Sequence, residues 1–135
     1  MNRKAIIKLL LEALISFDIH PQLCDEILKI ITGSGYEQRF FKLLVARLEY
    51  LSRHGVHSVS HEEFESIGDK LFSMHLAQKG FNIRILYAFL SNGIPTLLTC
   101  FYEREGKQKT DYTPYIAPAR ERLRRRQEDL KNGRS

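Results

Sequence analysis

Hydrophobic residues in the first part of the chain recur with the period of an α-helix. Over residues 3–17, the apolar side chains of Ile6, Leu9, Ala13 and Phe17 fall on one face of such a helix. The predicted helix therefore has one side to bury against the rest of the protein and one side that faces water.

Two further helices are predicted to follow. The first begins at Pro21, because proline suits the first turn of a helix, and ends in the glycine-containing stretch 33–35. The second covers residues 36–53, and its stripe of apolar side chains also contains Arg47. Residues 1–35 are therefore expected to form a helical N-terminal extension.

The pattern changes after the third helix. Residues 54–70 are polar, and Ser60 followed by Glu63 predicts a capping box at the start of a short helix. From residue 70 onwards, apolar and polar residues alternate as they do in strands with one buried face.

Three strands are predicted, over residues 70–77, 82–90 and 95–103. The dipeptides between them are Lys-Gly at 79–80 and Asn-Gly at 92–93, and such dipeptides favour tight turns. The strands are therefore expected to form an antiparallel meander.

The two turns also predict which residues lie opposite one another. The turn at 92–93 places Ile85 opposite Cys100 and Tyr87 opposite Leu98. The turn at 79–80 places His75 opposite Arg84, on a mixed face that is expected to be open. This mixed face collects Ser73, His75, Asn82, Arg84, Leu86, Ala88, Thr99 and Phe101.

The final segment is predicted to be a basic helix. It begins near Pro114, and Ile116, Ala119, Leu123 and Leu130 form an apolar stripe among arginines. The expected fold class is α+β, with N-terminal helices packed on a small antiparallel sheet of about three strands and the basic C-terminal helix after it.

Length and composition indicate one domain. With 135 residues, of which 43% are hydrophobic, residues 1–135 are expected to fold around a single core. The net charge is +5, but residues 1–69 hold 8 basic and 10 acidic side chains, whereas residues 70–126 hold 11 and 4. This distribution favours a polyanion or an acidic partner for the second half.

Neither a disulfide framework nor a metal site is expected. Cys24 and Cys100 are too few for such a framework, and we expect both to be reduced. His54, His57 and His61 are three or four residues apart, but no cysteine or carboxylate completes a ligand set. No apolar run reaches the roughly 18 residues of a membrane span, so the protein is expected to be soluble and cytoplasmic.

Residues 71–122 combine a strand, a strand with an arginine, a hairpin, a turn with lysines and a terminal helix in a specific order and spacing. The positions that carry this pattern are Leu71, Phe72, Met74, Arg84, Ile85, Leu86, Tyr87, Phe89, Leu97, Leu98, Phe101, Lys107, Lys109, Thr110, Ile116, Ala119 and Arg122. In this pattern the second half resembles the RelE/HigB toxin superfamily, in particular its phage-derived HigB-like branch. His75 stands where the family usually has an arginine, and Phe72 where it has a tryptophan.

The resemblance implies a toxin of a type II toxin-antitoxin system that cleaves messenger RNA in the ribosome without a metal or other cofactor. Its expected partners are a cognate helix-turn-helix antitoxin, messenger RNA and ribosomal RNA. A heterotetramer with the antitoxin is one assembly that the resemblance allows.

The chemistry of RNA cleavage suggests roles for five candidate catalytic residues. Arg84 is expected to hold the scissile phosphate through its planar guanidinium, and His75 is one candidate for the acid or base. Lys107 and Lys109 would add positive charge, and a lysine among other cations can also serve as the acid or base. Tyr112 or Tyr115 would stack on a base or orient the phosphate. Further candidates for RNA binding are Lys79, Asn82, Tyr115, Arg120, Arg122 and Arg124.

Other interpretations remain open. A ParE-like relative would poison DNA gyrase without cutting RNA, and a basic interaction module would have no activity of its own. Arg84 itself would then be an ordinary strand arginine that lies over Phe101 with its head in water. The arginines of the terminal helix would form a solvated helix face.

Overall fold

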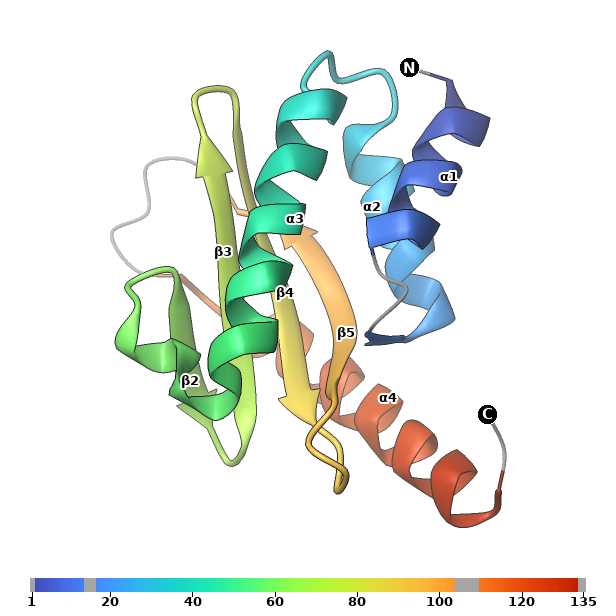
Figure 1. Ribbon diagram of the computed structural model, residues 1–135, viewed down its shortest axis with the longest axis vertical. Helices are drawn as coiled ribbons and strands as arrows, with labels where there is room; N and C mark the ends of the chain where they lie inside the picture. Colours follow the sequence, from blue (N-terminus) through green and yellow to red (C-terminus); the bar gives the residue numbers. More distant parts are fainter. Residues whose placement is uncertain (1, 14–16, 104–109, 134–135) are drawn as a thin grey trace.

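The computed structural model describes residues 2–13, 17–103 and 110–133. These residues form an α+β fold in which helices lie on both faces of one mixed sheet (Figure 1). The helices are α1 (Arg3–Ala13), α2 (Pro21–Ile31), α3 (Glu37–His54), the 3-10 helix η1 (Gly55–Ser60) and α4 (Thr113–Lys131). The strands are β1 (Asp18–Ile19), β2 (Phe64–Gly68), β3 (Leu71–Gln78), β4 (Phe81–Phe89) and β5 (Pro95–Tyr102).

The sheet has five strands in the order β1-β5-β4-β3-β2, so the prediction of about three strands was wrong. The three predicted strands correspond to β3, β4 and β5, which pair antiparallel with their neighbours. The additional strands lie at the two edges, and β1 runs parallel to β5. The sheet is therefore mixed rather than purely antiparallel.

Both edge strands lack the pattern that reveals a strand in sequence. β1 has only two residues, which is too short to show an alternation. Within β2 only Phe64 is buried, so this segment reads as polar. The short helix predicted from Ser60 and Glu63 is wrong, because η1 ends at Ser60 and β2 begins at Phe64.

The predicted turns set most of the observed register. His75 lies opposite Arg84, and Ile85 lies opposite Cys100, as expected. Tyr87, however, lies opposite Leu97 rather than Leu98, because the register of β4 and β5 shifts between Leu86 and Tyr87. Such an irregularity adds a residue to one strand and turns the following side chains to the opposite face.

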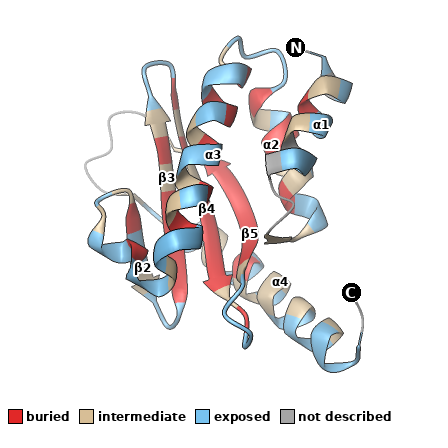
Figure 2. Cartoon of the chain, in the orientation of Figure 1, coloured by how far each residue is buried: buried red, intermediate tan, exposed pale blue. Residues whose placement is uncertain are grey.

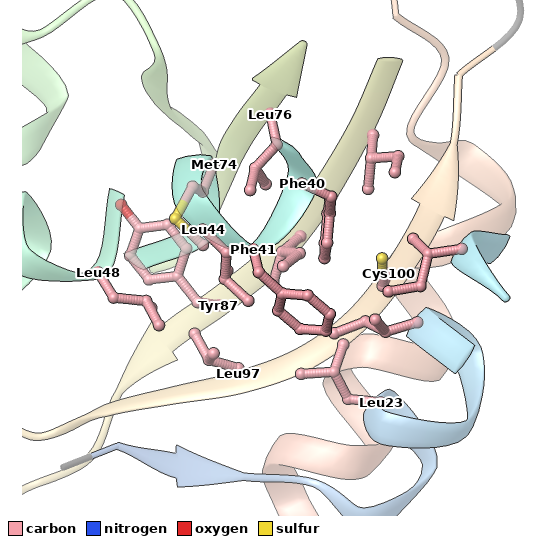
Figure 3. Packing of buried hydrophobic residues seen from close by; sticks show 14 of the residues in the cluster. Leu23, Phe40, Phe41, Leu44, Leu48, Met74, Leu76, Tyr87, Leu97 and Cys100 are labelled. Carbon is pink, nitrogen blue, oxygen red and sulfur yellow. The ribbon is translucent and has the colours of Figure 1, made fainter. Parts of the chain in front are cut away.

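Helices α1, α2 and α3 cover one face of the sheet and enclose the main core (Figures 2 and 3). Phe40 and Leu44 of α3 and Met74 and Tyr87 of the sheet are completely buried there. The N-terminal segment 1–35, which was predicted to be a helical extension, contains β1 in addition to its helices. It supplies Ile6, Leu23, Ile27, Leu28 and Ile31 to this same core.

Helix α4 lies on the opposite face, which the sequence had predicted to be open. Ala119 packs there with Leu71, Leu86, Leu98 and Phe101 in a second, smaller apolar cluster. Leu98 belongs to this cluster because of the shift in register. The expectation of an open face is therefore corrected for the part that α4 covers, whereas His75 and Arg84 remain partly exposed.

Candidate functional site

Nine polar side chains gather around the central strands in two contact networks, one around His75 and one around Arg84, which adjoin where β3 pairs with β4. Arg84 of β4 and His75 of β3 lie opposite each other at the centre of the set, because the tight turn at 79–80 sets the register of the two strands. Residues from α3, β2 and the chain on both sides of segment 104–109 surround them. We call this set the polar cluster; its members are Arg47, Glu63, Glu65, His75, Asn82, Arg84, Glu103, Thr110 and Tyr112.

The guanidinium of Arg84 is held between two carboxylates. Its Nε donates to Oε2 of Glu103 at 2.7 Å, and its Nη1 lies 3.7 Å from Oε1 of Glu65. The Arg84 side chain is 15% exposed and that of Glu103 only 10%, whereas Glu65 is 49% exposed. Arg84 is thus paired and largely buried, and its head does not project into water.

Glu103 carries the negative charge that balances Arg84. Its other oxygen accepts a hydrogen bond from the hydroxyl of Thr110. Burial opposes ionisation of Glu103, but the hydrogen bonds from Thr110 and Arg84 outweigh it and hold the pKa of this carboxyl below its ordinary value. Glu103 and Thr110 flank segment 104–109, so Lys107 and Lys109 lie outside the described residues.

Tyr112 stands at the start of α4 and completes this side of the cluster. Its hydroxyl donates to Glu65, and the Arg84 guanidinium lies 5.8 Å from the centre of its ring. Burial, followed by the hydrogen bond to Glu65, raises the pKa of Tyr112 to about 12. The phenol therefore keeps its proton at neutral pH and acts as a hydrogen-bond donor.

The imidazole of His75 has a polar neighbour at each ring nitrogen. Nδ1 lies 3.1 Å from Oε2 of Glu63, and Nε2 lies 2.5 Å from Oδ1 of Asn82. Arg47 donates from Nε to the backbone carbonyl of His75 at 3.0 Å. Its Nη2 is 3.8 Å from the same Glu63 oxygen. His75 therefore belongs to a chain of contacts that runs from α3 through Glu63 to Asn82.

The residues predicted to contact RNA occupy different places. Lys79 is exposed in the β3–β4 turn, where its carbonyl accepts a hydrogen bond from Arg39 at 2.8 Å. Asn82 belongs to the polar cluster. Tyr115 stacks on Phe101, with ring centres 3.7 Å apart and planes 3° from parallel, so one face of its ring is covered.

The three predicted arginines of α4 all make contacts within the protein. Arg120 donates to the carbonyls of Gly68 and Asp69 in the β2–β3 turn. Arg122 donates to Leu98 and to both carboxylate oxygens of Glu26, which joins α4 to α2. Arg124 is exposed and pairs on the helix surface with Glu121 and Glu128.

Sequence reasoning missed the carboxylates of the cluster and Arg47. Two signals were present in the sequence. Arg47 interrupts an apolar helical stripe, where a charge requires a partner. Glu103 lies two residues after Phe101, the residue opposite Arg84. Glu63 and Glu65 gave no comparable signal, because their segment was assigned to a helix.

The cluster combines a guanidinium that can bind an anion with an imidazole that can carry a proton. A phosphate that approaches Arg84 competes with Glu65, which is the more exposed of its two partners and the more distant one. Glu103 can stay bound through Nε and leave the Nη groups for two phosphate oxygens.

Two further properties concern metals and membranes. Within residues 2–13, 17–103 and 110–133, no three His, Cys, Asp or Glu side chains are grouped so that they could hold a metal ion. In the same part of the chain, no helix has both the length and the apolar character that crossing a membrane requires.

Comparison with known proteins finds no family model, no curated protein and no solved structure that matches the chain.

Proposed function

We propose that the chain is the toxin of a type II toxin-antitoxin system and that it cleaves messenger RNA on the ribosome. The observation that carries the proposal is the direct opposition of His75 and Arg84 on β3 and β4, with Tyr112 beside Arg84. These residues lie in the half of the chain that resembles the RelE/HigB superfamily, whose active sites are built from basic and aromatic side chains on the sheet.

The position of β1 supports the proposed relationship. Many members of the superfamily begin with a strand, which the sequence of this chain did not reveal. β1 precedes α2 and α3 and joins the sheet beside β5. Helix α1 would then be an addition to the superfamily's fold, placed ahead of β1, α2, α3 and the meander of β3, β4 and β5.

The proposed reaction is transfer of the phosphate to the neighbouring ribose 2′-hydroxyl. Arg84 would hold the phosphate and stabilise the charge that develops on it. His75 would take or supply a proton, and Tyr112, which stays protonated, would donate a hydrogen bond to the phosphate. The toxin would act in the cytoplasm, where ribosomes are, and a helix-turn-helix antitoxin would hold it silent.

The test uses expression in bacteria and purified ribosomes. The wild-type chain should arrest growth and cut ribosome-bound messenger RNA at codon-related positions. His75→Ala should lower cleavage by about 10²–10⁴-fold, the usual contribution of a general acid or base. His57→Ala, at an exposed histidine of η1, serves as the matched control and should leave cleavage unchanged.

Intact messenger RNA together with normal growth would overturn the proposal. Circular dichroism of each variant shows whether a lost activity reflects lost chemistry or a lost fold. Lys107→Ala and Lys109→Ala belong in the same series, since the resemblance gives both lysines a role.

A second candidate is a ParE-like gyrase poison. The specific observation in its favour is that the polar cluster contains three carboxylates, of which Glu65 and Glu103 both pair with Arg84. Such a charge balance suits phosphate binding less well than an unpaired basic face. Growth arrest with DNA damage and uncut messenger RNA would favour this candidate over the ribonuclease.

A further inference from the structure

Glu63 and His75 are joined twice, once through the backbone and once through their side chains. The backbone N–H of His75 donates to the carbonyl of Glu63 at 2.8 Å. The Glu63 carboxylate then lies 3.1 Å from Nδ1 of the imidazole. Because the backbone contact holds the two residues side by side, the Glu63 side chain loses little conformational entropy when its carboxylate contacts the ring.

Arg47 contacts both members of the same pair. It extends from α3, which belongs to the layer that covers the main core, and contacts both the carbonyl of His75 and the Glu63 carboxylate. Its side chain is 18% exposed, and those of Glu63 and His75 are about as buried, at 25% and 24%. An arginine in an apolar stripe loses hydration on folding, and these two contacts offset the cost of that desolvation.

The carboxylate determines which nitrogen of the neutral ring carries the proton. Glu63 accepts a hydrogen bond only from a protonated Nδ1, so Nε2 is left with a lone pair. Oδ1 of Asn82 lies against Nε2, which suits the charged ring, and with the amide turned over its NH2 group donates to the lone pair of the neutral ring. Asn82 is thus compatible with the neutral ring and with the charged one.

We infer that Glu63 and Arg47 are positioning residues that hold His75 with Nδ1 protonated and Nε2 available to exchange a proton. The consequence for catalysis rests on the proposed function. In that reaction Nε2 takes the 2′-hydroxyl proton as the 2′-oxygen bonds to phosphorus. The bond from phosphorus to the 5′-oxygen breaks, and water supplies a proton to that oxygen. The products are a 2′,3′-cyclic phosphate and a 5′-hydroxyl end, and His75 returns its proton to water.

The decisive experiment is nuclear magnetic resonance of the imidazole nitrogens, recorded on the whole chain at a pH where the ring is neutral. In the wild type, His75 should show a protonated Nδ1 whose hydrogen exchanges slowly with water. Glu63→Ala should remove this protection and yield a mixture of the two neutral forms of the ring. Glu63→Gln keeps an oxygen acceptor without the charge and should retain part of the protection.

A matched control and a second variant isolate the contact. Glu62 is exposed and adjacent in sequence, so Glu62→Ala should leave the imidazole signals unchanged. Arg47→Met keeps much of the apolar stem and should accelerate exchange of the Nδ1 proton. If Glu63→Ala does not fold, Glu63→Gln and Arg47→Met still provide the comparison.

Kinetics adds a measurement that a purely structural role would not change. With ribosome-bound messenger RNA, Glu63→Ala should lower kcat by about 10- to 100-fold with little change in KM, as when a partner that orients a functional histidine is lost. Unchanged imidazole signals in Glu63→Ala would overturn the inference, whatever the cleavage assay shows. A protected Nδ1 proton in a protein that cuts no RNA would instead refute the proposed function and leave the positioning of His75 intact.

Discussion

The two faces of the sheet differ in the interactions that join them to the helices. Under α1, α2 and α3 lies the larger apolar core, in which Phe40, Leu44 and Tyr87 are fully buried (Figure 3). Under α4 the apolar cluster is small, and the polar cluster adjoins it. Burial of apolar surface stabilises in proportion to its area, so we assign most of the stability of the fold to the first face.

The difference explains where chemistry can occur in this protein. The face under α1, α2 and α3 is filled mainly with hydrocarbon, and burial raises the pKa of its Tyr87 phenol and Cys100 thiol, so neither loses its proton at neutral pH. The face with α4 holds charged side chains near the surface, and these are fixed by one another rather than by dense packing. Such a site keeps reactive groups in place while leaving some of them, such as Glu65, exposed.

The largest expected effect comes from breaking the apolar face. Phe40→Ala should lower the free energy of unfolding by about 3–5 kcal/mol, because a fully buried ring is lost and a cavity remains. Leu130→Ala on α4, where the side chain is 37% exposed, should cost less than about 1 kcal/mol. Chemical denaturation measures both, and equal losses would contradict the division of roles between the two faces.

A smaller loss is expected when the buried charge pair of the other face is broken. Glu103→Ala leaves Arg84 without its nearest carboxylate and should cost about 2–4 kcal/mol, within or somewhat below the range for buried pairs. The double variant Arg84→Met with Glu103→Leu should recover most of this loss, because no unpaired charge remains buried: Glu65, which also loses Arg84, is half-exposed. Failure of the double variant to recover would assign the loss to packing instead.

The same pair predicts a pH dependence. The pKa of Glu103 is lower in the folded protein than its ordinary value of 4.5. Its contribution to stability is therefore complete above about pH 4.5 and is lost as the pH falls through the lower, folded value. Denaturation curves recorded across this window give the free energy of unfolding at each pH. This free energy should fall more steeply with decreasing pH in the wild type than in Glu103→Gln.

The smallest effect distinguishes two arginines of α4. Arg122→Ala removes contacts with Glu26 and Leu98 that join α4 to the rest of the fold, and should cost about 1–3 kcal/mol. Arg124→Ala removes only exposed pairs on the helix surface and should cost between about 0 and 1 kcal/mol. Thermal melts of the two variants test the comparison, and a larger loss of stability in Arg124→Ala than in Arg122→Ala would contradict it.

Short-range patterns predicted more of the main core than of the candidate site. The stripe of α3 and the alternation in β3 and β4 identified buried residues, because helical and strand periods act over a few neighbouring positions. The partners of Arg84 were not predicted, since Glu65 and Glu103 come from two other parts of the chain. A carboxylate in a polar stretch, such as Glu65, looks the same in sequence whether it meets water or a guanidinium.

The sequence alone determined the three helices ahead of the meander, the terminal helix and the opposition of His75 and Arg84. Local hydrophobic periods and two turn dipeptides were sufficient for these. Only the tertiary structure decided that β1 and β2 complete the sheet, that the register shifts near Tyr87, and that α4 covers part of the second face. The same holds for the carboxylates around Arg84 and His75, because each of these features depends on contacts between segments that are distant along the chain.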